Sequence, residues 1–155
     1  MARALETTFT IADVPAARVA SFRADELAGR PASFEVEIVL LGYIELDALL
    51  GHPAELAFGP AGEEPRRLCG IVEEATSIGS GELGFEDRGT RYRLKVSSRL
   101  GPLTRSFGSQ IFQEMSVKDI VAAVVAEHGV DKAEWRLAAE YPEREYCVQY
   151  QESAL

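Results

Sequence analysis

The chain has 155 residues, of which 46% are hydrophobic and 26% charged, as in an ordinary globular domain. This length is sufficient to bury a core without disulfides or metals. Its 25 acidic residues outnumber its 16 basic residues, giving a net charge of −9. Nucleic acid and anionic membrane surfaces are therefore poor partners, because both favour clustered Lys and Arg.

Targeting segments and metal sites are not predicted. The longest apolar run, residues 38–44, is far shorter than the roughly 20 residues of a membrane helix, and the N-terminus has no apolar stretch typical of a signal peptide. We therefore expect a cytoplasmic chain without a membrane anchor. Cys69, Cys147, His52 and His128 lack metal-ligand spacing, so we predict no metal and no cofactor and expect both cysteines to be buried.

The first hundred residues show the pattern of short β-strands. In chain order the predicted elements are strands at 9–11, 17–22 and 33–40, a helical turn at 45–50 ended by Gly51, and a strand at 54–58. Residues 67–96 then form a predicted long hairpin. Within it, Gly70 marks a bulge or a close backbone approach, and the Gly-rich tip at 79–90 is expected to be mobile.

Two of these strands alternate clearly enough to predict which side chains are buried. Strand 33–40 has apolar residues at every second position, and strand 91–96 does the same. We expect one shared barrel core that contains Phe34, Val36, Ile38, Ile71 or Val72, Tyr92, Leu94 and Val96. Many short strands with turn residues between them favour a barrel or a sandwich over a parallel sheet.

One helix is predicted at 117–128, followed by a final strand at 146–150. Ser116 is a favourable N-cap, Asp119 suits the helix dipole in the first turn, and Gly129 supplies the stop. The fold class is therefore mainly β with one or two helices (α+β).

Catalytic arrangements are not found in the sequence. Each histidine has a local structural explanation, and no Gly-x-Ser-x-Gly turn precedes a helix. The adjacent Glu73 and Glu74 would face opposite sides of a strand, and Gly79–Gly81 lacks the residues of a phosphate-binding loop. We therefore predict that the chain is not an enzyme.

The charged faces of the two clear strands are the candidate site. Arg91, Arg93 and Lys95 share one face of their strand, and Glu35 and Glu37 project from an outer face of the same kind. Two interpretations remain open: a solvated outer sheet surface, or an interface with a partner or subunit that carries an acidic complement. We also expect a cross-strand ladder between the glutamates and the basic residues.

The final strand carries a motif with a known counterpart. Residues 141–153 read Y-P-E-R-E-Y-C-V-Q-Y-Q-E-S, which resembles the Y-x-x-R-x-Y-x-x-Q-Y-x-E-S/T signature of VgrG proteins, the trimeric spikes of type VI secretion systems. Further matches to the family occur in the same order at 46–51, 70–72, 92–96 and 111–121. Together these motifs cover nearly the whole chain.

The resemblance implies a structural hub of a contractile injection machine, built of tube-like antiparallel β-barrels. Residues 1–107 would form the first hub barrel, and 108–155 a helix and the opening strands of a second, incomplete domain. The implied partners are a homotrimer in the full-length protein, the hexameric Hcp tube, baseplate components and effectors, with export by the secretion machine itself. The chain would then be the N-terminal piece of a longer protein.

Two alternatives stay open. A contractile phage or phage-like tail hub of the late-control family shares the same barrels. A small-ligand-binding β-barrel is the second alternative, and it would require a hollow interior. For the chain by itself we expect a monomer or a weak, concentration-dependent oligomer in place of a tight trimer, because its net charge opposes close packing of identical copies.

Overall fold

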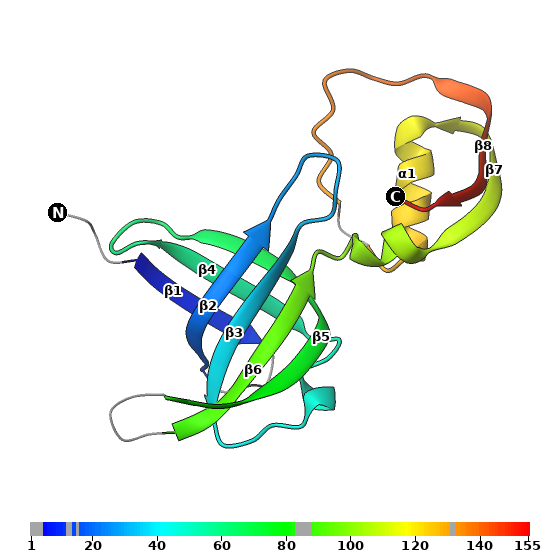
Figure 1. The fold of residues 1–155 in the computed structure, drawn as a ribbon. Helices are drawn as coiled ribbons and strands as arrows, with labels where there is room; N and C mark the ends of the chain where they lie inside the picture. The colour runs from blue at the N-terminus through cyan, green and yellow to red at the C-terminus, as the bar shows by residue number, and fades with distance from the viewer. Residues whose placement is uncertain (1–4, 12–13, 15, 83–87, 131–132) are drawn as a thin grey trace. The chain divides into compact units, whose positions relative to one another are not determined.

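The computed structural model describes residues 5–11, 14, 16–82, 88–130 and 133–155 (Figure 1). The chain divides into two compact units, residues 1–98 and 99–155. This division lies after Ser98, whereas the sequence analysis places the domain boundary after Phe107. Within the described ranges, no helix is both long and apolar enough to cross a membrane.

The first unit is a nearly closed barrel of six antiparallel strands (Figure 1). The strands are β1 (Leu5–Ile11), β2 (Arg18–Asp25), β3 (Ser33–Leu41), β4 (Pro53–Pro60), β5 (Arg66–Glu82) and β6 (Arg88–Ser97). They are hydrogen-bonded in the order β1-β4-β5-β6-β3-β2, and a bridge between Phe9 and Ala17 joins the two edges of the sheet. This architecture confirms the predicted mainly β barrel.

The barrel interior is filled by side chains from β1, β3, β4, β5 and β6. All the residues predicted to share one core do so, with Val72 as the β5 member while Ile71 is half-buried. Val36, Ile38, Tyr92, Leu94 and Val96 are completely buried, as is Leu56 of β4. Period-two alternation produces this result, because each of these strands presents one face to the interior.

Two local contacts fix the barrel at its ends. The buried Tyr92 hydroxyl donates to the Ile44 carbonyl at 3.0 Å and accepts from the Ile44 amide at 2.7 Å. These two hydrogen bonds hold the segment that leads into a short 3₁₀ turn, η1 (Leu46–Ala48). Gly51, with φ of +76°, follows this turn. Gly70 is the predicted close approach: a Cβ there would lie 2.2 Å from the Ser97 carbonyl oxygen.

The second unit contains a two-stranded sheet and one helix. It comprises the 3₁₀ turn η2 (Gly101–Arg105), β7 (Phe107–Ser116), α1 (Val117–Glu127) and β8 (Glu143–Ser153), with β7 and β8 antiparallel. The helix begins as predicted, with the Asp119 amide donating to the Ser116 hydroxyl at 3.2 Å. It ends at His128, which is followed by Gly129 with φ of +76°.

Several sequence-based expectations are wrong or incomplete. Cys69 is exposed and Cys147 is half-buried, so neither is the buried residue we expected; Cys69 alternates with the buried Leu68 and Gly70 and therefore faces outward. Strand β7 was not predicted, because its residues do not alternate and its pairing comes from the distant β8. Most of the predicted loop at 79–90 belongs to β5 and β6, and its remaining residues, 83–87, lie outside the described part of the chain.

Candidate interaction surface

The five candidate residues lie together on the outer surface of the barrel, where β3 pairs with β6. Glu35 is in register with Lys95, Glu37 with Arg93, and Val39 with Arg91. The opposite faces of the same strands fill the core, so alternation directs these five side chains outward. We call this group the charged face.

Glu37 is the centre of the charged face. Its two carboxylate oxygens bind different arginines: Oε1 accepts from Arg93 Nη2 at 2.7 Å and Nε at 3.1 Å, and Oε2 accepts from Arg91 Nη2. The hydrogen bonds from Arg93 and then Arg91 lower the pKa of Glu37 below its ordinary value of 4.5. These contacts form the cross-strand ladder that we expected for Glu37.

Lys95 has a different partner from the one expected. Its ammonium group lies 2.8 Å from Glu74 Oε1 on β5, although Glu35 is its register partner on β3. The hydrogen bond to Glu74 raises the pKa of Lys95 above its ordinary value. The register shift between Val72 and Glu74 brings Glu74 opposite Lys95, and a shift of this kind has no local sequence signal beyond the nearby glycine.

Strand β2 extends the charged face. The Ser21 hydroxyl donates to Glu37 Oε2 at 3.3 Å, and Arg23, which is in register with Glu35, pairs with Asp25 at 3.6 Å. A hollow of about 240 Å³ lies here, lined by Arg23, Asp25, Ser33, Phe34, Glu35 and Lys95. Sequence reasoning missed Ser21, Arg23, Asp25 and Glu74, and alternation along β2 was the signal available for Arg23 and Asp25.

One atom of the charged face lacks a hydrogen-bond partner. Arg91 Nε is buried and has none, while the Nη2 atom of the same side chain binds Glu37. The face as a whole contains three cations and two carboxylates, in a chain whose net charge is −9. Glu74, which binds Lys95, and the Arg23–Asp25 pair on β2 balance these charges, so the surface is polar and mixed in sign.

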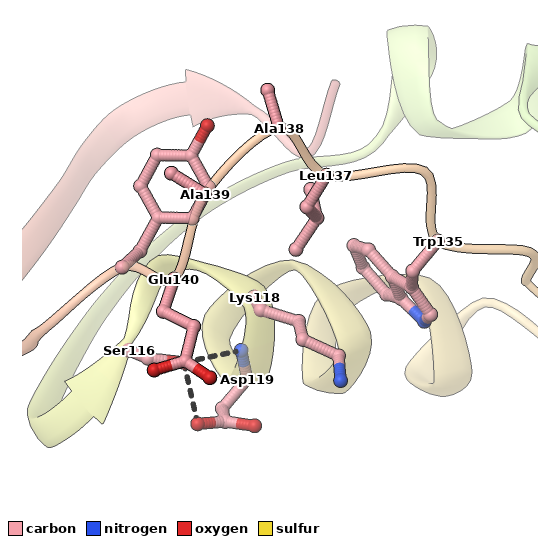
Figure 2. A pocket seen from close by; sticks show the side chains of 9 residues that line it. Ser116, Lys118, Asp119, Trp135, Leu137, Ala138, Ala139 and Glu140 are labelled. Carbon is pink, nitrogen blue, oxygen red and sulfur yellow. Dashed lines mark hydrogen bonds between the residues drawn. The ribbon is translucent and has the colours of Figure 1, made fainter.

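The second unit has a separate, open hollow of about 640 Å³. Figure 2 shows Trp135 and Leu137 from the connecting segment beside Lys118 and Asp119 from the first turn of α1. The polar groups at the helix start already bind each other, because the Ser116 hydroxyl donates to Asp119 Oδ2 at 2.6 Å. Lys118, Glu140 and Tyr141 line the same hollow.

A hydroxyl–imidazole contact joins Ser106 to His128. The ring nitrogens of His128 bind the Val124 carbonyl and the Ser106 hydroxyl, each at 2.8 Å, so this histidine links α1 to the start of β7. Among the residues that the structure describes, no group of three or more His, Cys, Asp or Glu side chains could hold a metal ion.

Comparison with known proteins identifies the family. Residues 24–155 match the family described as phage tail baseplate hub (GPD). The chain is 40% identical over 141 residues to the type VI secretion system spike protein VgrG4b of Pseudomonas aeruginosa, and 37% identical over 142 residues to VgrG5 of the same organism. The chain belongs to the phage tail baseplate hub family, as one of its VgrG-like members.

Each of these alignments covers 89% of the chain but only 16% and 17% of the respective relative, so the chain spans about one sixth of their length. A solved structure supports the fold, with a TM-score of 0.70 over 94% of this chain and 40% of the other, at 24% identity. It is the E. coli c3393 protein, described as a component of the type VI secretion system with structural similarity to the T4 bacteriophage tail proteins gp27 and gp5.

Proposed function

We propose that this chain is a structural part of the hub of a contractile injection machine of the type VI secretion kind. The observation that carries the proposal is the filled six-strand barrel, in a chain whose family is the phage tail hub and whose relatives are spike proteins. Residues 1–107 would be the first hub barrel, and 108–155 the beginning of a second hub domain. The segment would act by assembly, without a catalytic residue.

The proposed assembly is a trimer that joins the spike to the hexameric Hcp tube. Two hub barrels per chain would give six around a threefold axis, which resolves the mismatch between a trimeric spike and a hexameric tube. In this proposal the protein is made in the cytoplasm and leaves the cell with the machine, together with baseplate components and effectors.

Isolation of assembled particles tests this role. It also distinguishes this role from that of a phage tail hub, which is the machine named in the family description. The protein would carry an epitope tag in its own cell, and sheath-and-tube particles would be purified and labelled with gold-tagged antibody. We expect label at one end of particles that contain Hcp. Label on particles with phage tail-tube proteins would favour the phage hub, and particles of both kinds without label would overturn the proposal.

The charged face is proposed as a contact surface within this assembly. Arg91 and Arg93 share the single carboxylate of Glu37, which leaves one positive charge there for an acidic side chain of a partner. Arg93→Glu should reduce the amount of tagged protein in the particles. Arg66→Glu is the matched control, because Arg66 is an exposed barrel arginine whose ion pair is with Glu26 and which lies outside the charged face. Equal incorporation of both variants would leave the face with a solubility role only.

The ligand-binding barrel is not favoured. A barrel that holds a small molecule needs an internal cavity, whereas this interior is occupied by side chains such as Ile38, Leu56 and Leu94. The described hollow on the barrel is lined largely by the charged face and its β2 neighbours.

A further inference from the structure

The two glutamates of the charged face differ in how many partners they have. The carboxylate of Glu37 accepts hydrogen bonds from Arg93 and Arg91, and a further one from the Ser21 hydroxyl, so both of its oxygens are occupied. Glu35 lies two residues earlier on the same face of β3 and is exposed. Within the described part of the chain, no hydrogen bond or ion pair reaches the carboxylate of Glu35. Glu35 is therefore the open carboxylate of this face.

The two cations that lie opposite Glu35 are both bound to other acids. On β6, Lys95 is the register partner of Glu35, but its ammonium group binds Glu74 at 2.8 Å. On β2, Arg23 is the register partner, but its guanidinium pairs with Asp25 at 3.6 Å. Each of these cations is matched by an acid of its own. The negative charge of Glu35 is therefore not balanced on the barrel surface.

Glu35 lines the hollow of about 240 Å³ on the barrel, together with Asp25, Arg23 and Lys95. Asp25 balances Arg23, and the partner of Lys95 on β5 balances that lysine, so the hollow has one negative charge in excess. Pockets for small molecules are usually larger, about 300–1,000 Å³. A smaller hollow with an excess carboxylate suits a single basic side chain. Arginine fits best, because its planar guanidinium binds a carboxylate through two parallel N–H donors.

The opposite excess lies a short distance along β3. The side chains of Arg91 and Arg93 are 40% and 54% exposed, and they share the one carboxylate of Glu37, which leaves one positive charge there. Arg93 is the register partner of Glu37, so this positive charge lies two strand positions, about 7 Å, from Glu35. The charged face therefore carries one negative and one positive charge in excess, in a fixed order along the strand.

We propose that the charged face binds one partner surface at two points: a basic side chain of the partner enters the hollow and binds Glu35, and an acidic side chain about 7 Å away on the same partner binds Arg91 and Arg93. This inference rests on the proposed function, in which the partner is a neighbouring component of the hub assembly. Alternate residues of a partner strand have the required spacing. The order of the two charges, more than the net charge, selects the partner and fixes its orientation.

Charge variants of the tagged protein, measured by their incorporation into the purified particles, test the role of Glu35. Glu35→Arg should reduce incorporation at least roughly fivefold, because it places like charges opposite each other. Glu35→Gln removes the charge without adding repulsion and should reduce incorporation about two- to fivefold, the range of one exposed ion pair. Glu6→Arg and Glu6→Gln are the matched controls and should leave incorporation unchanged, because Glu6 is an exposed glutamate of β1 outside the charged face.

A double variant separates the order of the charges from the net charge. Glu35→Arg combined with Arg93→Glu keeps the net charge of the face and reverses the order of its two charges. Incorporation of the double variant should therefore be reduced at least as much as that of either single variant. Restored incorporation would overturn the proposal, because the net charge alone would then be sufficient for binding.

Circular dichroism melts of the purified variants establish whether each barrel is folded. If the charge reversals do not fold, Glu35→Gln decides, because Glu35 has no hydrogen bond within the described residues that this change would remove. Normal incorporation of both Glu35 variants, with Arg93→Glu reduced, would overturn this inference and leave the proposed contact at the arginines in place. Normal incorporation of Arg93→Glu as well would overturn both. Absence of the unmodified protein from the particles would overturn the proposed function and this inference with it.

Discussion

At the scale of single residues, Tyr92 links the barrel core to the loop outside it. Its ring is completely buried, and its hydroxyl forms two hydrogen bonds to the backbone of Ile44. A buried polar group is tolerated when it is paired in this way, and it then specifies one position for the loop. Alternation along β6 predicts the burial of this ring, but its partner is determined by the path of the chain after β3.

Replacement of this hydroxyl should destabilise the barrel. Tyr92→Phe leaves the Ile44 amide and carbonyl without their partner, and we expect a loss of about 1–2 kcal/mol in the free energy of unfolding. Denaturant titration should show a lower midpoint at unchanged slope. Tyr43→Phe is the control, because the exposed Tyr43 hydroxyl makes a long hydrogen bond of 3.5 Å to Glu45 and its removal should be nearly neutral.

Glu37 should make stability depend on acid pH. Its pKa is lower in the folded chain than its ordinary value of 4.5, because Arg93 and Arg91 bind the charged form. Its contribution is therefore fully present above pH 4.5 and is lost as the pH falls through the lower, folded pKa.

Thermal unfolding between about pH 6 and pH 3 tests this linkage. The midpoint of the unmodified chain should fall more steeply with acid than that of Glu37→Gln, which has no such charge to lose. Glu35→Gln, a change on the same face of the same strand, should retain the steep fall. Parallel curves for the unmodified chain and Glu37→Gln would contradict the expected role of the two arginine bonds.

At the scale of elements, β5 passes close to the end of β6 because the residue of β5 at that point, Gly70, has no side chain. Gly70 is buried, and a Cβ there would lie 2.2 Å from the Ser97 carbonyl oxygen and 2.8 Å from a Val96 methyl group. The first obstacle is backbone, which cannot rotate away. A larger residue would therefore push two paired strands apart.

Gly70→Ala should accordingly cost about 1–3 kcal/mol of barrel stability, the usual range for overpacking. Gly59→Ala in β4 is the matched control, because the nearest atom to its added Cβ is a Pro65 backbone carbon at 3.3 Å. Urea titrations of the two variants should differ clearly, with Gly59→Ala closer to the unmodified chain. Equal midpoints would show that β5 can move at Gly70 without loss.

At the scale of the whole molecule, the two units differ in how much core they possess. The barrel buries a contiguous apolar cluster from five of its strands. Among the described residues of the second unit, Gly101 and Leu103 are the buried ones, while Phe107, Ile111, Tyr146 and Tyr150 are more than 60% exposed. A two-stranded sheet with one helix and so little burial is marginal in isolation.

The two units should therefore separate in their folding. Residues 1–98 alone should give a cooperative thermal transition, and residues 99–155 alone should lack one. Circular dichroism melts of both pieces and of the full chain provide the measurement. Leu94→Ala in the barrel piece checks that the transition reports the core, because this change should lower the free energy of unfolding by about 2–5 kcal/mol. A cooperative melt of the isolated second unit would show that its sheet and helix are sufficient.

The sequence by itself determined the faces of the main strands and the limits of the helix. Strands such as β3 and β6 have a side-chain period of two, so alternate residues share a face whichever strand becomes the neighbour. The Ser116 cap and the Gly129 stop act within a few residues of the helix they bound. The family motif at residues 141–153 is likewise local, because it is a continuous stretch of sequence.

Only the tertiary structure decided which charges meet and which strands pair. The partner of Lys95 is Glu74 because of a register shift in β5, and β7 is a strand because the distant β8 supplies its hydrogen bonds. Register and pairing are relations between segments far apart in the chain, and each depends on how all the strands settle around one core. The contacts of the charged face follow from that arrangement, because alternation along a strand predicts which side chains share a face but not which strand lies beside it.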